Sequence, residues 1–131
     1  MTSPARAVVD KMFNAFLAKD LETAQSTVTE DTLWVHNGSQ KMPALRFVGK
    51  SGTEKFFSTA FNTIVFDYFR PLTFIEQGDT IAVLGEESFT PEGQPKVTNK
   101  WVQVYTIHDG LIAQMDEYAT SASAEDYIVI D

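Results

Sequence analysis

Two side chains in this sequence combine acid–base chemistry with positions that predict burial, His36 and Glu117. His36 is one of only two histidines and ends a strand-like run that begins at Leu33. A neutral imidazole that faces a cavity can take a proton from carbon or from water near pH 7. Glu117 is in phase with Met115, so a strand here would turn its carboxylate into apolar surroundings suited to proton exchange. We expect these two residues to act as an acid–base pair.

Each of these two residues could instead have a simple structural role. His36 could serve only as a hydrogen-bonding residue, because histidines often do so in folded proteins. Glu117 could pair with a buried donor or lie at a wet rim of the pocket. Asp116 should lie on the opposite face of the strand and is therefore the weaker acidic candidate.

A long β-hairpin is predicted over residues 100–118. β-Branched and aromatic residues fill both arms, and Asp109-Gly110 between such arms is a strong hairpin signal. Because side chains alternate between the two faces of a strand, one face of the first arm gathers Trp101, Gln103 and Tyr105. The same rule gathers on the second arm Leu111, Ala113, Met115 and Glu117.

This mixture of aromatic, amide and acidic side chains is typical of a pocket wall. Amides on a buried face need hydrogen bonds to protein, water or ligand, which makes Asn99 and Gln103 candidates to orient a ligand. Of the adjacent Glu86 and Glu87, which must face opposite sides, we expect Glu87 in the pocket because it is in phase with the bulkier residues. We expect the apolar wall to be formed by Phe13, Phe16, Trp34, Trp101, Tyr105 and Met115.

Helices are expected to come first along the chain. Ser3-Pro4 can start an amphipathic helix, with a buried face of Val9, Met12, Phe13, Phe16 and Leu17. Asp20 can cap a second, short helix that reaches about residues 29–31. Residues 51–54 have the spacing of a capping box and predict a third helix.

Strands are expected at 33–36, at 64–74 as a bent or edge strand interrupted by Pro71, at 80–90, and in the hairpin. Helices followed by a run of antiparallel strands predict an α+β fold in which a curved sheet wraps around the helices. The whole chain, residues 1–131, is expected to form one domain. The apolar segment 127–130 is expected to pack back on this domain or on a partner subunit.

The composition narrows the function classes. A formal net charge of −8 and no visible basic patch argue against binding to nucleic acid or to a membrane. The absence of cysteine excludes disulfides and thiolate chemistry, and there is neither a long apolar run nor the order of a signal peptide, so we expect a cytoplasmic protein. Two distant histidines and no phosphate-binding or dinucleotide motif lead us to expect no metal and no cofactor.

The order of these elements resembles that of the nuclear transport factor 2-like (NTF2-like) superfamily, and in particular its SnoaL-like, ketosteroid-isomerase-like proteins. The resemblance covers almost the whole chain and is carried by Asp31-Thr32-Leu33-Trp34, Gly49-Lys50-Ser51-Gly52 and Asp109-Gly110-Leu111-Ile112 before Glu117-Tyr118. It implies an α+β cone, a pocket between the helices and the concave face of the sheet, and frequently a homodimer through the other face.

The resemblance also implies roles for single residues. His36 stands where ketosteroid isomerases hold their carboxylate base, whereas Met12 and Gln103 stand at their oxyanion-hole tyrosine and protonated aspartate. In limonene epoxide hydrolases, Trp34 and His36 correspond to the residues that orient water, and Glu117 corresponds to an aspartate near the chain end. SnoaL-type polyketide cyclases use an acidic pocket residue, which Glu117 or Asp116 could supply.

Two functions stay open at this point. The first is a cofactor-independent isomerase, cyclase or hydrolase acting on a hydrophobic cyclic small molecule, with His36 as base or water activator and Glu117 as partner acid or base. The second is a non-catalytic ligand-binding or dimerisation module with the same cavity. The missing oxyanion donors favour the second.

Overall fold

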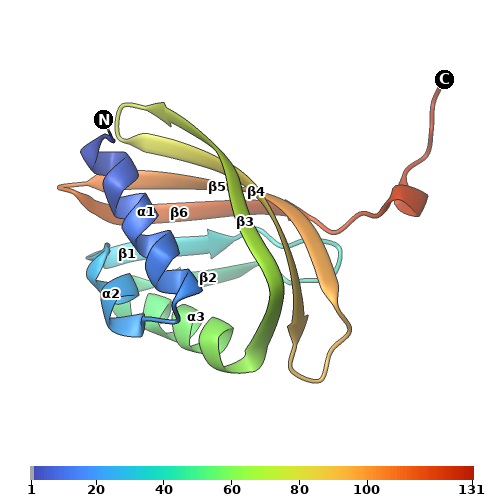
Figure 1. Ribbon diagram of the computed structural model, residues 1–131, viewed down its shortest axis with the longest axis horizontal. Helices are drawn as coiled ribbons and strands as arrows, with labels where there is room; N and C mark the ends of the chain where they lie inside the picture. Colours follow the sequence, from blue (N-terminus) through green and yellow to red (C-terminus); the bar gives the residue numbers. More distant parts are fainter. Residues whose placement is uncertain (1) are drawn as a thin grey trace.

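Three helices cover one side of a six-stranded sheet in the computed structural model, which describes residues 2–131 (Figure 1). The helices are α1 (Pro4–Leu17), α2 (Leu21–Ser26) and α3 (Gly49–Thr63), and a 3-10 turn, η1 (Ala124–Asp126), follows the last strand. The strands are β1 (Val28–His36), β2 (Leu45–Val48), β3 (Ile64–Gln77), β4 (Thr80–Pro91), β5 (Val97–His108) and β6 (Leu111–Thr120). The predicted α+β class is confirmed.

The sheet has the order β2-β1-β6-β5-β4-β3. Four of its neighbouring pairs are antiparallel, as expected, while β1 and β6 form one parallel pair that the sequence did not predict, so the sheet is mixed and mostly antiparallel. Short connections make successive strands from β3 to β6 antiparallel. β1 is linked to that run only through β2 and the helix α3, and this longer connection leaves its direction relative to β6 free. β3 is the edge strand that the sequence predicted, with irregular pairing on both sides of Pro71.

Helix α1 crosses the sheet as its sequence predicts (Figure 1). Ser3 Oγ accepts a hydrogen bond from the Arg6 N–H, and Pro4 occupies the first turn. Val9, Met12, Phe13 and Phe16 are buried. Leu17 is 58% exposed, contrary to expectation, because the helix ends there and Ala15 takes the inward position beside Phe16.

The other two helices differ from expectation at their ends. α2 stops at Ser26, because the backbone of Thr27 already accepts a hydrogen bond from the Ile112 N–H and so begins the pairing of β1 with β6. α3 begins at Gly49, ahead of the expected capping box, and its N-cap residue Val48 makes no side-chain cap. The hydroxyl of Thr53, inside the helix, makes hydrogen bonds to the Gln25 side chain and the Lys50 carbonyl. The short strand β2 just before α3 was not predicted.

The long hairpin forms around the predicted turn, where Asp109 and Gly110 have positive φ angles of 50° and 75°. On β5, the residues Asn99, Trp101, Gln103 and Tyr105 all face inward. A bulge shifts the pairing beyond Thr106, and the inward residues of β6 are therefore Ile112, Met115 and Glu117. The expectation that Leu111 and Ala113 share the inner face is wrong, since simple alternation does not allow for a bulge.

The tail after β6 leaves the body of the domain and its end stands clear of it (Figure 1). Tyr127, Ile128, Val129 and Ile130 are 60%, 90%, 80% and 90% exposed. The expectation that this segment packs back on its own domain is therefore wrong, while packing on a partner subunit stays a prediction. Within residues 2–131, no helix has the length and apolar character needed to cross a membrane.

Candidate functional site

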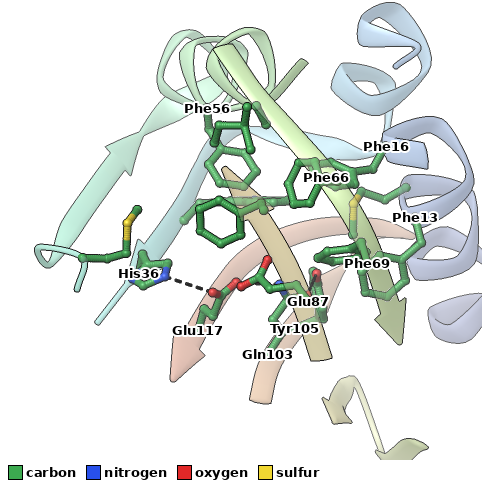
Figure 2. A pocket seen from close by; sticks show the side chains of 16 residues that line it. Phe13, Phe16, His36, Phe56, Phe66, Phe69, Glu87, Gln103, Tyr105 and Glu117 are labelled. Atoms are coloured by element: carbon green, nitrogen blue, oxygen red, sulfur yellow. Dashed lines mark hydrogen bonds and ion pairs between the residues drawn. The ribbon is translucent and has the colours of Figure 1, made fainter. Parts of the chain in front are cut away.

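A cavity of about 90 Å³ lies between the helices and the inner face of the sheet (Figure 2). Its wall is mostly aromatic, and three titratable side chains gather at one side of it. The residues that line it are Met12, Phe13, Phe16, Trp34, His36, Met42, Phe56, Ala60, Ile64, Phe66, Phe69, Glu87, Phe89, Gln103, Tyr105 and Glu117.

His36 and Glu117 meet in this wall because β1 and β6 are neighbours and pair these two residues in register. His36 Nε2 lies 3.0 Å from Glu117 Oε2. The other ring nitrogen, Nδ1, accepts a hydrogen bond of 3.0 Å from the Gly38 N–H. An imidazole nitrogen that accepts a hydrogen bond carries no proton. The ring proton is therefore on Nε2, which donates a hydrogen bond to Glu117.

The second oxygen of Glu117 is also held. Gln103, which is paired with Glu117 across β5 and β6, donates from Nε2 to Glu117 Oε1 at 2.6 Å. The hydroxyl of Tyr105 in turn donates to the Gln103 side-chain oxygen, which fixes the orientation of that amide. Burial, and next the charge of Glu117, raise the pKa of Tyr105 well above its usual value, so the phenol remains a donor. These contacts hold the carboxylate of Glu117 between two N–H groups.

Glu87 supplies a second carboxyl group to the same wall, on β4 (Figure 2). Its side chain accepts a hydrogen bond of 3.0 Å from Asn99 Nδ2, its register partner on β5. Burial first, and then the negative charge of Glu117, raise the pKa of Glu87 to about 7, against smaller lowering effects of Asn99 and His36. Glu87 is only 7% exposed, so it is a buried carboxyl group that can change its protonation state near neutral pH.

The pKa of His36 is raised from its ordinary value, chiefly by the hydrogen bond to Glu117 and with help from the charges of Glu117 and Glu87. Burial of the ring acts in the opposite direction. The charge of Glu117 therefore contributes to the pKa shifts of both Glu87 and His36. The adjacent Glu86 lies apart from these three residues and pairs with Arg70 at 3.0 Å on the other face of the sheet.

The structure brings most of the sequence-predicted site residues to the cavity, but not all of them. Besides the three titratable groups, its wall contains Phe13, Phe16, Trp34, Gln103 and Tyr105. Asn99, Trp101 and Met115 are buried behind that wall. Asn99 still contacts the site through Glu87, while Trp101 stacks on Phe69 with 5.1 Å between ring centroids.

Sequence reasoning missed several aromatic residues of the wall. Phe66 and Phe69 both reach the cavity although they are three residues apart, because β3 has an irregular pairing between them and strict alternation fails. Phe56 could have been found, since the helical spacing of α3 already put it on the inner side. The methionine Met42 comes from the loop between β1 and β2, where no periodicity applies.

Two buried polar atoms near the site have no partner within residues 2–131, the indole Nε1 of Trp34 and the side-chain Oδ1 of Asn99. A buried donor left unpaired costs about 1–3 kcal/mol, so a ligand able to accept from Trp34 would gain stability. Among the same residues there is no group of three or more His, Cys, Asp or Glu side chains placed to hold a metal ion.

Residues 9–115 match the family described as the SnoaL-like domain. The chain belongs to this family. A comparison with curated proteins finds none that matches the chain.

Solved structures similar to this SnoaL-like domain share its fold over most of their length. An NTF2-like protein from Burkholderia xenovorans LB400 is 21% identical, with 91% of each chain covered and a TM-score of 0.79. TerC, co-crystallised with polyporic acid, is 25% identical over 88% of this chain and 91% of its own, with a TM-score of 0.73. An LEH-like epoxide hydrolase from M. tuberculosis is 17% identical over 90% and 84%, with a TM-score of 0.72.

The NTF2-like, ketosteroid-isomerase-like architecture is thereby confirmed. Proteins with this fold include cyclases, isomerases and epoxide hydrolases, and many have no known function. The fold alone therefore does not select one reaction, and the chemistry has to be argued from the side chains of the site.

Proposed function

We propose that this SnoaL-like domain is a cofactor-independent acid–base enzyme that moves protons within a small, mostly apolar molecule. The observation that carries the proposal is the pair of buried carboxyl groups, Glu117 and Glu87, in the wall of one aromatic cavity. One is bound by two N–H groups, and the other has a pKa of about 7. Two titratable groups with different environments are the usual basis for dividing acid and base roles.

The contacts suggest a division of roles. Glu117, whose two oxygens accept hydrogen bonds from His36 and Gln103, is assigned as the base. Glu87 is close to half protonated near pH 7 and can give a proton to the substrate or take one. Both nitrogens of His36 already make hydrogen bonds, so we assign it to positioning Glu117 rather than to direct proton abstraction.

The balance of such a reaction is simple. Glu117 removes a proton from a carbon of the substrate while Glu87 gives a proton to another atom of the same molecule. A later exchange of one proton between the two carboxyl groups, directly or through water, restores the starting state. Nothing is oxidised or consumed, which is the balance of an isomerisation or a ring closure. The mostly apolar cavity wall supports this class over hydrolysis, which needs a place for a reacting water.

The comparisons support a small-molecule ligand. TerC was crystallised with polyporic acid, and a ketosteroid-isomerase-like protein from Catenulispora acidiphila was crystallised with trimethylamine. The cavity of about 90 Å³ is smaller than the roughly 300–1,000 Å³ of typical ligand sites, so a cyclic substrate requires the aromatic wall to move. The half-buried side chains of Phe56, Phe66 and Phe69 can make such room.

The same narrow cavity favours a second function, a ligand-binding module without chemistry. A small molecule could occupy the aromatic part of the cavity and leave the carboxyl groups untouched. Native mass spectrometry of the purified protein can distinguish an enzyme from a binding module. The mass of a co-purified ligand helps to identify it, and its chemical structure then shows whether it has an acidic C–H bond to break.

With a substrate in hand, the decisive comparison is between carboxyl groups inside and outside the cavity. Glu117→Gln and Glu87→Gln should each lower turnover by about 10²- to 10⁴-fold, the usual contribution of a general acid or base. The matched controls are their sequence neighbours, Asp116→Asn and Glu86→Gln, which should leave turnover within about twofold. Unchanged turnover in both cavity variants, with the fold intact by circular dichroism, would leave the ligand-binding function instead.

A further inference from the structure

The tail that follows β6 is built to point away from its own domain. Gln40, in the loop between β1 and β2, accepts from the backbone N–H and the hydroxyl of Ser121, and donates to the hydroxyl of Thr120. Ser123 and Asp126 then close a capping box around η1. The direction of the chain is thus set by hydrogen bonds, and the residues that follow, 127–130, stand beyond the surface of the domain (Figure 1).

The outer face of the sheet carries an open, mostly apolar groove. Its volume is about 620 Å³, and it spans β3, β4, β5 and β6. Register pairing makes Thr73, Leu84, Val102 and Tyr118 a continuous row across these four strands, and Leu72 lies beside it. Leu72 is 61% exposed and Tyr118 is 54% exposed. Contiguous exposed apolar surface of this kind marks interaction sites.

We propose that the apolar tail, residues 127–130, docks in the outer-face groove of a second copy of this chain. Four extended residues span about 13 Å, at about 3.3 Å each. The row from β3 to β6 crosses three strand spacings of about 4.8 Å, or about 14 Å, so the tail and the row match in length. The site is separate from the cavity and does not depend on the proposed enzymatic function.

Charge complementarity between the tail and the groove supports the tail as the bound segment. Lys100 and Glu86 both line the groove. Glu86 already pairs with Arg70 at 3.0 Å, and Lys100 is exposed at the groove. The tail carries Glu125 before its apolar residues and Asp131 after them, so an acidic group at either end can reach a lysine at the rim. The tail begins beside the β6 end of its own groove, but the Gln40 contacts direct it outward, which favours the groove of another copy.

Disulfide trapping tests this directly, because the chain has no cysteine of its own. One variant carries Val129→Cys in the tail and the other carries Leu84→Cys in the groove, and the two are mixed under mild oxidation. We expect a disulfide-linked dimer of the two variants as the main cross-linked product. The control replaces the groove variant with Lys11→Cys, an exposed position on α1, and should trap at least tenfold less.

Two further measurements test whether the tail binds another copy of the chain. Ile128→Asp combined with Ile130→Asp should weaken dimerisation at least tenfold in sedimentation experiments, while circular dichroism stays unchanged because both side chains are exposed. A chain that is monomeric at 100 μM before substitution overturns the proposal. Equal trapping with Leu84→Cys and Lys11→Cys overturns it as well. If a single chain carrying both Val129→Cys and Leu84→Cys closes within itself, the tail folds back on its own domain and the proposal is wrong.

Discussion

At the scale of single residues, the unusual feature is a buried carboxylate whose two oxygens are both fixed. Glu117 accepts one hydrogen bond from the His36 ring and another from the Gln103 amide. The backbone N–H of Gly38 and the hydroxyl of Tyr105 fix the orientation of those two side chains. Such preorganisation is what a base needs in order to work in an apolar cavity without reorganising its surroundings. In the proposed function, His36 acts through these contacts by positioning Glu117.

Glu87 makes the stability of the fold depend on pH. In the folded chain its pKa is about 7, whereas its ordinary value is 4.5, so between these values the folded state binds more protons than the unfolded state. The free energy of unfolding should therefore fall as pH rises from 4.5 to 7, by up to roughly 3 kcal/mol. The pKa of His36 is raised too, so stability from its protonated form is lost as pH rises through that pKa.

Urea unfolding at pH 5 and at pH 8 measures this dependence. Glu87→Gln should remove most of the loss of stability between the two pH values, whereas Glu86→Gln should keep it. The carboxyl groups of Asp20, Asp67 and Asp126 do not interfere, because their pKa values are lowered and they remain ionised throughout this range. The same loss in Glu87→Gln as in the unaltered protein would show that Glu87 has an ordinary pKa.

The sequence could predict which residue types form the site, but not the contacts among them. His36 and Glu117 are 81 positions apart, and their meeting depends on the parallel pairing of β1 with β6, which no local pattern encodes. The pairing of Gln103 with Glu117 depends in the same way on the register of β5 and β6. Alternation could not decide between Glu86 and Glu87, but phase with the bulkier residues of the strand favoured Glu87, which is the one that lines the cavity.

At the scale of elements, the boundaries and phases of strands were hardest to predict. Periodicity found α1, α3 and the long hairpin, because each has many residues that agree with one pattern. The bulge in the hairpin and the irregular pairings of β3 reverse the phase of the residues beyond them, and nothing in the local sequence shows where this happens. These irregularities also bring Phe66 and Phe69 together into the cavity.

Gly85 on β4 makes room for the aromatic packing around Trp101. It is opposite Trp101 in the sheet, and a Cβ atom at this position would meet the indole ring and lie 2.6 Å from the Arg70 carbonyl oxygen. Gly85→Ala should therefore lower the free energy of unfolding by about 2–3 kcal/mol through overpacking. Chemical denaturation monitored by tryptophan fluorescence measures the change.

A second glycine gives the control for this prediction. Gly78 has a φ of 58° and no atom within 4 Å of a Cβ built on it, so Gly78→Ala should cost only about 1 kcal/mol of backbone strain. If the two variants lose the same stability, Trp101 can move aside and Gly85 is not required for the packing.

At the scale of the whole molecule, the core and the candidate site are made from the same side chains. Phe13 lines the cavity and also packs against Phe69, Trp101 and Tyr105, with ring centroids 5.8–6.5 Å apart. The domain therefore cannot widen its cavity without losing core contacts. This explains why a fold with a pocket can have so little open volume in it.

Phe13→Ala should enlarge the cavity and lower the stability of the fold at the same time. We expect a loss of about 3–5 kcal/mol in the free energy of unfolding, together with tighter binding of a small apolar fluorescent probe. Phe74→Ala is the matched control, because Phe74 contacts Phe13 but does not line the cavity. It should lower stability without improving binding of the probe. Equal binding by the two variants would mean that the probe does not enter the cavity.

Glu87 and Glu117 lie in the wall of one buried cavity, and NMR titration of ¹³C-labelled glutamate carboxyl groups tests their interaction without a substrate. We expect Glu87 to titrate at about 7 and Glu117→Gln to lower its midpoint, while burial keeps it above the ordinary value of 4.5. A Glu87 midpoint near 4.5 that does not respond to Glu117→Gln would show that the two carboxyl groups do not interact in the cavity.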